Sequence, residues 1–506
     1  MKIRSILMAV LALAVMSACQ KEAPQSSVKD PSSANSVGYV ALKINLPSTM
    51  GTKAESFEDG EAYEYKVNDV NVIFYNDAGD YIYHTSVSPN PWDNNAAGDI
   101  TVSGKTGAIK ITAEGATQAL VLINSDGVLT AADLVKSYGD LNVAISGNAQ
   151  KVTGASNDDF FMSNAPKYVG DKFTALVPVT LSETALEAEA APATVQVERA
   201  AAKVQLNYAD EFTNSNGKAK ITGWNLSVTN KSFYPVRKGL DKAASNGWFD
   251  ASSDPVNAGL LGTTTTRVYW AEDPNYTGTY GTFDATQFDK VSESALTLAN
   301  GGVAYCLENT FETGSMRENQ TTTAMIKAVY IPDTFTEGET WFMVGTGNTI
   351  YSLDAFATYV VGKLPVGTSV TADQVKALAF TAGDCSSLTV DGKSLSSLVG
   401  TVTCYLDGVC YYPVKIRHFN YEELGYADED AFKSAFKLNS GYSEQDLGRY
   451  GVLRNTWYKV TVNSITNPGT PEVPAPGIGS DDEYEQFCAC TIDILAWSVR
   501  NHSVNL

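Results

Sequence analysis

The sequence is poor in the residue patterns that most often carry catalysis or metal binding. Only 3 of its 506 residues are histidine, and these stand far apart at His84, His418 and His502. It contains no His-x-x-x-His pair, Cys-x-x-Cys pair, Gly-x-Ser-x-Gly elbow or phosphate-binding loop. These absences argue against zinc enzymes, serine hydrolases and nucleotide-dependent enzymes. We therefore expect a protein that is not an enzyme and uses no cofactor or metal.

Basic residues are scarce relative to acidic ones. Lysine and arginine number 36, against 57 aspartate and glutamate residues, which gives a formal net charge of −21. Proteins that bind nucleic acid or anionic lipid surfaces need a basic patch to neutralise phosphate groups. The charge balance therefore argues against both kinds of partner and favours an acidic, soluble surface.

Cysteine is sparse for an exported chain, at 7 residues. Small secreted domains that depend on disulfides carry a much higher density of cysteine, so we do not expect a scaffold held together by disulfides. Cys488 and Cys490 fall on one face of a predicted strand, where two small buried apolar residues are a simpler interpretation than a metal site. The other cysteines are Cys19, Cys306, Cys385, Cys404 and Cys410.

Long hydrophobic runs are absent except at the beginning of the chain. The apolar stretch 6–15 follows a short basic region and precedes Met16-Ser17-Ala18-Cys19. This pattern is typical of a lipoprotein signal peptide, so we expect residues 1–18 to be removed and Cys19 to carry lipid. Two or more acyl chains would anchor a precursor stably to the outer membrane, with residues 20–36 as a solvated tether. The alternative is an ordinary signal peptide in which Cys19 is incidental.

The body of the chain is dominated by a period of two in hydrophobicity. Residues 40–46 alternate between apolar side chains and smaller or polar ones, and residues 70–75 show the same alternation before the turn Asn76-Asp77-Ala78-Gly79. Each pattern predicts a strand with one buried face and one polar or mixed face. Helical windows are few and short, at residues 130–137 and 371–378. Many short strands separated by Gly and Asp turns predict an all-β protein built of sandwiches.

One tight hairpin is predicted at residues 404–411. Asp407-Gly408 is typical of a two-residue type I′ turn, which would place Tyr405 opposite Cys410. In that register Cys404 and Cys410 point to opposite faces. The two thiols should therefore not bond to each other.

The two ends of the chain carry strands that adjoin irregular segments. The strand Val37–Leu46 is followed by the polar residues 47–55, and residues 466–477 contain four prolines, which favour an extended and semi-stiff spacer. A second apolar run follows at residues 490–499. An apolar strand that follows a spacer must pair with another strand.

These features resemble the fimbrillin family, the subunits of type V pili, over nearly the whole chain. No single motif decides the resemblance, but the order of the motifs along the chain is specific to the family. The segments that carry it are 70–79, 159–165, 197–204, 223–231, 305–310, 411–418 and 451–460.

The resemblance implies two tandem transthyretin-like β-sandwich domains with a few short helices. The N-terminal domain would span 54–206 and the C-terminal domain 207–465. The signal peptide (1–18) and a tether with a removable first strand (19–53) would precede these domains, and a spacer (466–489) and a donor strand (490–506) would follow them. The resemblance also implies a subunit of a cell-surface fimbrium that supports adhesion and assembles with other copies and accessory subunits.

The resemblance further implies that a trypsin-like surface protease removes the first strand. Lys53 is the best candidate for the cut, before Ala54, because the chain has no arginine between Arg4 and Arg199. Lys43 is a competitor, but it falls inside the predicted strand Val37–Leu46 and would be shielded. The missing arginine leaves open the identity of the protease and an uncleaved anchor subunit that keeps its lipid.

The donor strand that would fill a neighbour's groove is predicted at the C-terminus. Its apolar residues alternate between two faces, as in a strand buried on both sides; they are Ile492, Ile494 and Ala496 on one face and Leu495, Trp497 and Val499 on the other. The alternative is that this run is simply the last strand of its own domain. Two other roles stay open for the chain, namely an anchor or tip subunit of the pilus and a glycan-binding surface lipoprotein.

Overall fold

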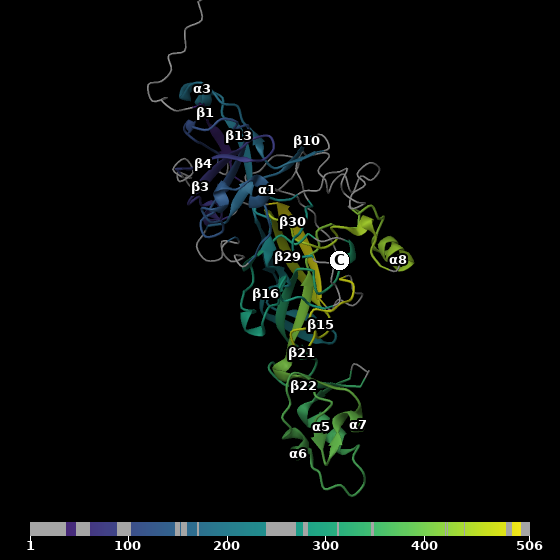
Figure 1. Cartoon of the computed structure of the whole chain (residues 1–506). Helices are drawn as coiled ribbons and strands as arrows, with labels where there is room; N and C mark the ends of the chain where they lie inside the picture. The colour runs from purple at the N-terminus through teal and green to yellow at the C-terminus, as the bar shows by residue number, and fades with distance from the viewer. Residues whose placement is uncertain are drawn as a thin grey trace, which may run out of the picture.

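The protein is mostly β-structure, which confirms the all-β prediction. The computed structural model describes residues 37–46, 61–88, 103–146, 152, 159–169, 172–238, 270–276, 282–310, 313–345, 349–419, 421–422, 424–439, 441–481 and 488–496. Figure 1 shows an elongated molecule in which the N-terminal strands lie at one end and the helices α5–α7 lie at the other. Strands β14–β21 and β28–β30 occupy the middle.

The first half of the described chain forms one large sheet with the order β4-β3-β7-β9-β13-β2-β5. Apolar side chains on its two faces belong to two separate hydrophobic clusters. Val72 and Phe74 lie in one cluster, and Ile73 and Tyr75 lie in the other. The strands of this half are β1 (Gly38–Val40), β2 (Leu42–Asn45), β3 (Val70–Tyr75), β4 (Tyr81–Val87), β5 (Ser103–Lys105), β6 (Ile109–Ile111), β7 (Gln118–Ile123), β8 (Ile145–Ser146), β9 (Met162–Asn164), β10 (Lys167–Val169), β11 (Lys172–Thr174), β12 (Val177–Pro178) and β13 (Ala193–Arg199). Its α-helices include α1 (Tyr138–Leu141) and α3 (Ala185–Ala190).

The prediction that residues 70–75 are only half buried is wrong, because every residue of β3 is buried. Strand β3 lies between β4 and β7 and is covered on both faces. The side chain expected to face solvent, Asn71, receives a hydrogen bond from Ser86 Oγ at 2.7 Å and donates one to Ser125 Oγ at 2.9 Å. Asn71, the polar residue between apolar positions of this strand, is therefore a buried group with hydrogen-bond partners and not a surface residue.

The second half contains two facing four-stranded sheets, β20-β14-β29-β30 and β15-β16-β21-β28. A single cluster with Trp224, Ile326 and Tyr458 fills the space between them. The chain passes from the first sheet to this sandwich at Ala200, between β13 and β14. The strands are β14 (Ala201–Asn207), β15 (Phe212–Asn214), β16 (Gly217–Ser227), β17 (Thr229–Asn230), β18 (Ser232–Phe233), β19 (Phe288–Asp289), β20 (Val303–Leu307), β21 (Thr323–Pro332), β28 (Val409–Lys415), β29 (Thr456–Ile465) and β30 (Cys488–Ala496).

A separate lobe, residues 341–405, is inserted between β21 and β28. It has its own apolar core, in which Phe342 stacks on Phe356 with ring centroids 4.4 Å apart. Thr371 caps helix α6 by accepting a hydrogen bond from Gln374 N, as expected for the helical window 371–378. The lobe comprises β22 (Trp341–Val344), β23 (Ile350–Ser352), α5 (Leu353–Val361), α6 (Ala372–Lys376), β24 (Gly383–Asp384), β25 (Thr389–Val390), β26 (Lys393–Ser394), α7 (Leu395–Val399) and β27 (Val402–Tyr405). Helix α8 (Glu429–Asn439) follows β28 and lies to one side of the molecule (Figure 1).

The predicted hairpin at residues 404–411 is wrong in its strand pairing. Asp407 and Gly408 do adopt the positive φ angles of a type I′ turn, 53° and 70°. However, β27 pairs with β22 and β24 in the inserted lobe, whereas β28 pairs with β21 in the sandwich. The turn therefore connects two different cores, and Cys404 and Cys410 are not bonded to each other.

The proline-rich segment after β29 lies along strand β28. Thr470 forms an isolated antiparallel bridge with Tyr411, and the hydroxyl groups of Tyr405 and Tyr412 donate hydrogen bonds to the carbonyl oxygens of Gly469 (3.0 Å) and Asn467 (2.9 Å). The segment is extended, as its prolines predict. It is also attached along its length, and we call residues 466–481 the strap.

We expect Gly469→Ala to detach the middle of the strap. A Cβ atom at this position would lie 2.1 Å from the Tyr411 carbonyl oxygen, and backbone cannot move aside as a side chain can. The free energy of unfolding, measured by urea titration, should fall by about 1–3 kcal/mol. Gly477→Ala is the matched control, because its Cβ would meet only the flexible end of Glu318. Equal stability of both variants and the natural protein would contradict this prediction.

Candidate functional site

The first described strand is hydrogen-bonded along both of its edges. Strand β2 pairs in parallel with β13, from Leu42 opposite Ala193 to Asn45 opposite Gln196, and antiparallel with β5. Strand β1 pairs with β6. Two further backbone pairs, Tyr39 with Ser182 and Leu42 with Thr106, extend this bonding. The segment therefore lies inside the N-terminal fold and not at its margin.

One face of this first segment is buried along its length, and the other is buried at Tyr39 and Ala41 but only half-buried at Lys43 and Asn45. Val40, Leu42, Ile44 and Leu46 are at most 2% exposed and contact the main cluster of the N-terminal half. Tyr39 and Ala41 face the other way and pack with helix α3. Burying an aliphatic side chain of this size contributes about 1.5–3 kcal/mol. Removal of the segment would therefore expose an apolar slot together with unpaired backbone groups of β13 and β5.

We expect Leu42→Ala to lower the free energy of unfolding by about 2–5 kcal/mol, because Leu42 is fully buried in the main cluster. Lys43→Ala is the matched control, since Lys43 is half-buried on the same strand and should change stability by less than about 1 kcal/mol. Urea denaturation monitored by circular dichroism measures both variants. Similar losses in the two variants would show that the strand does not contribute through its apolar face.

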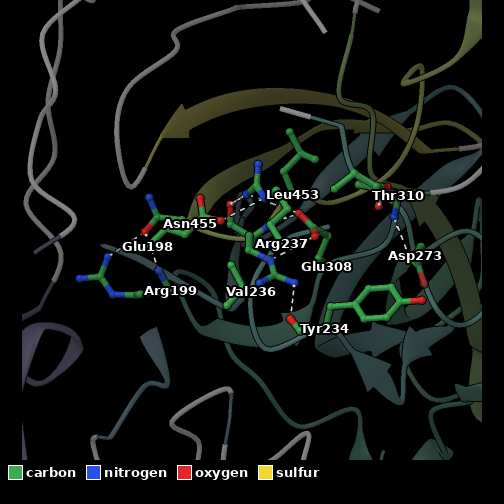
Figure 2. Close-up of polar contacts among 12 residues, drawn as sticks. Glu198, Arg199, Tyr234, Val236, Arg237, Asp273, Glu308, Thr310, Leu453 and Asn455 are labelled. Carbon is green, nitrogen blue, oxygen red and sulfur yellow. Dashed lines mark hydrogen bonds and ion pairs between the residues drawn. The ribbon is translucent and has the colours of Figure 1, made fainter. Parts of the chain in front are cut away.

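A second group of residues forms a buried ionic cluster near the point where the chain changes sheets (Figure 2). Arg237 Nε lies 3.1 Å from Glu198 Oε1, and Arg237 Nη2 lies 3.4 Å from Glu308 Oε2. Arg454 Nε binds the other oxygen of Glu308 at 3.1 Å. All four side chains are at most 5% exposed. Buried charges are tolerated only when they are paired, and removing one partner typically costs about 3–5 kcal/mol.

The neighbouring Arg199 and Lys203 connect this cluster to the short 3-10 helix at Ala62–Tyr65. Arg199 donates from Nε to the carbonyl oxygen of Glu64 at 2.8 Å and from Nη1 to Asn455 Oδ1 at 3.2 Å. Lys203 Nζ lies 2.7 Å from Glu64 Oε1, which also accepts a hydrogen bond from Tyr305. These hydrogen bonds and ion pairs join four segments that are distant in sequence: residue 64, 199–203, 305–308 and 454–455. The last three belong to the motifs that carried the sequence resemblance.

Sequence reasoning did not identify this ionic cluster. The motifs 197–204, 305–310 and 451–460 were recognised by their order along the chain and were interpreted as strand packing. Their charged residues Glu198, Glu308 and Arg454 were a usable signal, because charged side chains inside apolar strand patterns must find buried partners.

Asp273 lies beside this cluster, and its carboxyl group is strongly perturbed by burial. Burial, reinforced by the nearby Glu308, raises the pKa of Asp273 to about 7, although Asn275 and Thr310 donate hydrogen bonds that oppose the shift. A carboxyl group whose pKa is higher in the folded state contributes stability at low pH. That contribution is lost as the pH rises through the folded pKa.

We therefore expect the natural protein to lose stability relative to Asp273→Asn as the pH rises from about 4 to about 7. Asp284→Asn is the control, because hydrogen bonds from Thr286 lower the pKa of Asp284 below its usual value of 3.8, so its stability difference should stay constant from pH 4 to 7 and change only at lower pH. Urea titrations across this pH range give both differences. A difference for Asp273→Asn that is constant with pH would contradict the prediction.

Part of the segment predicted as the donor lies in β30, which pairs antiparallel with β29 in the same chain, as the alternative of a last strand of its own domain predicts. Ile494 lies opposite Tyr458, and Leu495 opposite Trp457. Strand β30 is the last strand of its sheet, so its second edge is not paired within that sheet. Of the predicted donor residues, Ile492, Ile494, Leu495 and Ala496 lie in this strand, whereas Trp497 and Val499 lie outside the described residues.

The predicted lipid acceptor Cys19 and the predicted cleavage residues Lys53 and Ala54 also lie outside the described residues. Within the part of the chain that is described, no group of three or more His, Cys, Asp or Glu side chains is placed to hold a metal ion. No helix among those residues is long and apolar enough to cross a membrane.

Several solved structures align with this chain at low sequence identity and with TM-scores below 0.5. A candidate cell adhesion protein from Bacteroides eggerthii is 14% identical with a TM-score of 0.39, over 91% of this chain and 96% of that one. Another from Parabacteroides distasonis is 11% identical with a TM-score of 0.42, over 92% and 99%. The tip fimbrial protein Mfa3 from Porphyromonas gingivalis is 12% identical with a TM-score of 0.36, over 91% and 100%.

No curated protein matches the sequence. A family model does match, over residues 403–503, and it is described as the C-terminal region of fimbrillin, the major fimbrial subunit protein type IV. This range runs from the end of the inserted lobe through β28, α8 and β29 to beyond β30. The predicted resemblance is therefore confirmed at residues 403–503, which are similar to the C-terminal region of fimbrillin.

Proposed function

We propose that this protein is a structural subunit of a cell-surface pilus that supports adhesion. In this proposal it is exported as a lipoprotein through Cys19, cut by a trypsin-like protease after Lys53, and polymerised by donor-strand exchange. The fimbrillin match supports the role of a fimbrial subunit that assembles with others. The single observation that carries the mechanism is the placement of residues 38–45 inside the N-terminal fold, bonded on both edges and with Leu42 and Ile44 fully buried in its core.

The physics of strand removal supports exchange as the consequence of cleavage. Once β2 leaves, the edges of β13 and β5 lose their hydrogen-bonding partners, and the slot once filled by Leu42 and Ile44 is exposed to water. Both defects favour the addition of an extended strand from another chain. A strand that is apolar on alternating positions restores the backbone ladder and the core at once.

The position of Lys43 supports Lys53 as the residue at which the protease cuts. Lys43 pairs in register with Thr194 on one side and Lys105 on the other, so its backbone is held inside the sheet. A protease needs an accessible, extended stretch of backbone. Lys53 falls in the polar segment 47–55, after the strand has ended.

The C-terminal strand is suited to the role of donor because it stands at an edge. Strand β30 has one partner in its sheet, β29, and its other edge is unpaired within that sheet among the described residues. Its release would break the pairing with β29 and remove Cys490 from the sandwich core. In a polymer it would then replace the first strand of a neighbouring copy.

A stepwise experiment tests the proposal with the full exported chain. Protein taken from the cell surface should begin at Ala54 and form ladders that resist sodium dodecyl sulfate. Lys53→Ala should block this cleavage, whereas Lys43→Ala, the matched control, should not. Deletion of residues 490–506 should leave cleaved monomers without ladders.

A peptide of residues 488–506 should bind the cleaved deletion variant and not the uncleaved one. The same peptide with Ile492→Asp and Ile494→Asp should not bind, because an apolar slot rejects unpaired charges. Ladders that persist after the deletion would refute the donor assignment. Surface protein that is monomeric, uncut and still acylated at Cys19 would refute the stalk role and favour an anchor subunit.

A further inference from the structure

Two cysteines of the inserted lobe lie on adjacent antiparallel strands. Cys404 is in β27, opposite Gly383 of β24, and Cys385 directly follows β24. The backbone N–H of Cys385 donates to the carbonyl oxygen of Val402 at 2.8 Å, which continues the pairing by one residue. The two cysteines therefore stand one diagonal step apart on the same ladder.

Both side chains point to the same face of that ladder. Alternate residues of a strand share a face, so Val402 and Cys404 point the same way, and Cys385 stands opposite Val402. All three belong to the apolar core of the lobe, where Cys385 is 2% exposed and Cys404 is fully buried. The two sulfur atoms therefore lie in the same buried apolar core.

Both thiols are free in this structure, and their neighbouring positions on the ladder affect their protonation. Burial, followed by the adjacent Cys385 thiol, raises the pKa of Cys404 to about 12. The Cys385 thiol in turn donates to the Thr381 carbonyl oxygen at 3.1 Å. Because only the thiolate attacks a disulfide, the folded pair is unreactive. Any bond between them has to form while the lobe is still folding.

We propose that Cys385 and Cys404 are oxidised to a disulfide when the chain folds outside the cytoplasm. The proposal rests on the export step of the proposed function. The oxidant is a disulfide-bearing compound or protein: one cysteine thiolate attacks it and forms a mixed disulfide, and the second cysteine then displaces the oxidant's remaining sulfur. The pair gives up two protons and two electrons, and the oxidant leaves as two thiols.

The bond would close the loop that contains the β25–β26 hairpin and helix α7. These elements form one wall of the lobe's core through Val390 and Leu395. A disulfide restricts the unfolded chain and so stabilises the folded lobe. An exported environment is oxidising enough to keep such a bond.

The test uses the full chain, with free thiols blocked by a maleimide in denaturant immediately after recovery from the cell surface. Without reductant, Cys385 and Cys404 should escape labelling and appear as one cross-linked peptide pair in mass spectrometry. With reductant both should be labelled. Reduction should lower the Tm of the lobe by roughly 5 °C or more, and Cys385→Ser with Cys404→Ser should abolish this response.

Cys306→Ala is the matched control, because burial alone raises the pKa of the Cys306 thiol and its removal should leave the redox response unchanged. If the chain is not found at the cell surface, the export proposal fails. The disulfide is then tested separately by refolding the purified full chain with oxidised glutathione and repeating the thiol labelling. Complete labelling of Cys385 and Cys404 without reductant, in surface protein or after such refolding, would overturn the inference. Neither readout depends on polymer formation.

Discussion

The N-terminal fold depends on backbone pairing between its first strand and two segments far away in the sequence. Residues 38–45 bond to 103–111 on one side and to 182–196 on the other. Strand β5 is joined to the large sheet only through this short segment, and β6 pairs with its first strand, β1. The segment supplies both backbone hydrogen bonds and apolar side chains, so any replacement has to supply both. The slot can therefore accept only an extended strand in which apolar side chains occupy alternate positions.

The buried ionic cluster is independent of that first strand. Glu64 lies after the predicted cut, and it holds Arg199 and Lys203 where the chain enters the second sandwich. Its partners near Asn455 and Glu308 belong to the second half of the molecule. The connection between the two halves would therefore survive the loss of residues before 54. Under the proposed cleavage, these contacts between the two halves would remain.

The alternation of apolar residues was enough to predict an all-β fold, extended structure within residues 37–46, where β1 and β2 lie, and a strand at the start of 490–499, where β30 is described to Ala496. It failed where the local pattern was compatible with two partners: Asp407-Gly408 adopts the predicted turn geometry, yet its flanking strands belong to different cores. It also missed that Asn71 is buried, because a polar residue at an alternate position indicates solvent unless its hydrogen-bond partners, distant in sequence, are known. The predicted domain limits, including the division at 206/207, stay predictions. The lobe at 341–405 has a core of its own within the second of those ranges.

The inserted lobe begins and ends at neighbouring positions of one sheet. Strand β21 ends at Pro332 and β28 begins at Val409, and Val329 pairs directly with Val409. In topological terms the lobe occupies the place of an ordinary hairpin loop. Lengthening a loop adds little closure entropy, so the sandwich tolerates a lobe of almost any size there. Related subunits could therefore differ widely at this end of the molecule, where Figure 1 places α5–α7, while the surfaces used for assembly stay the same.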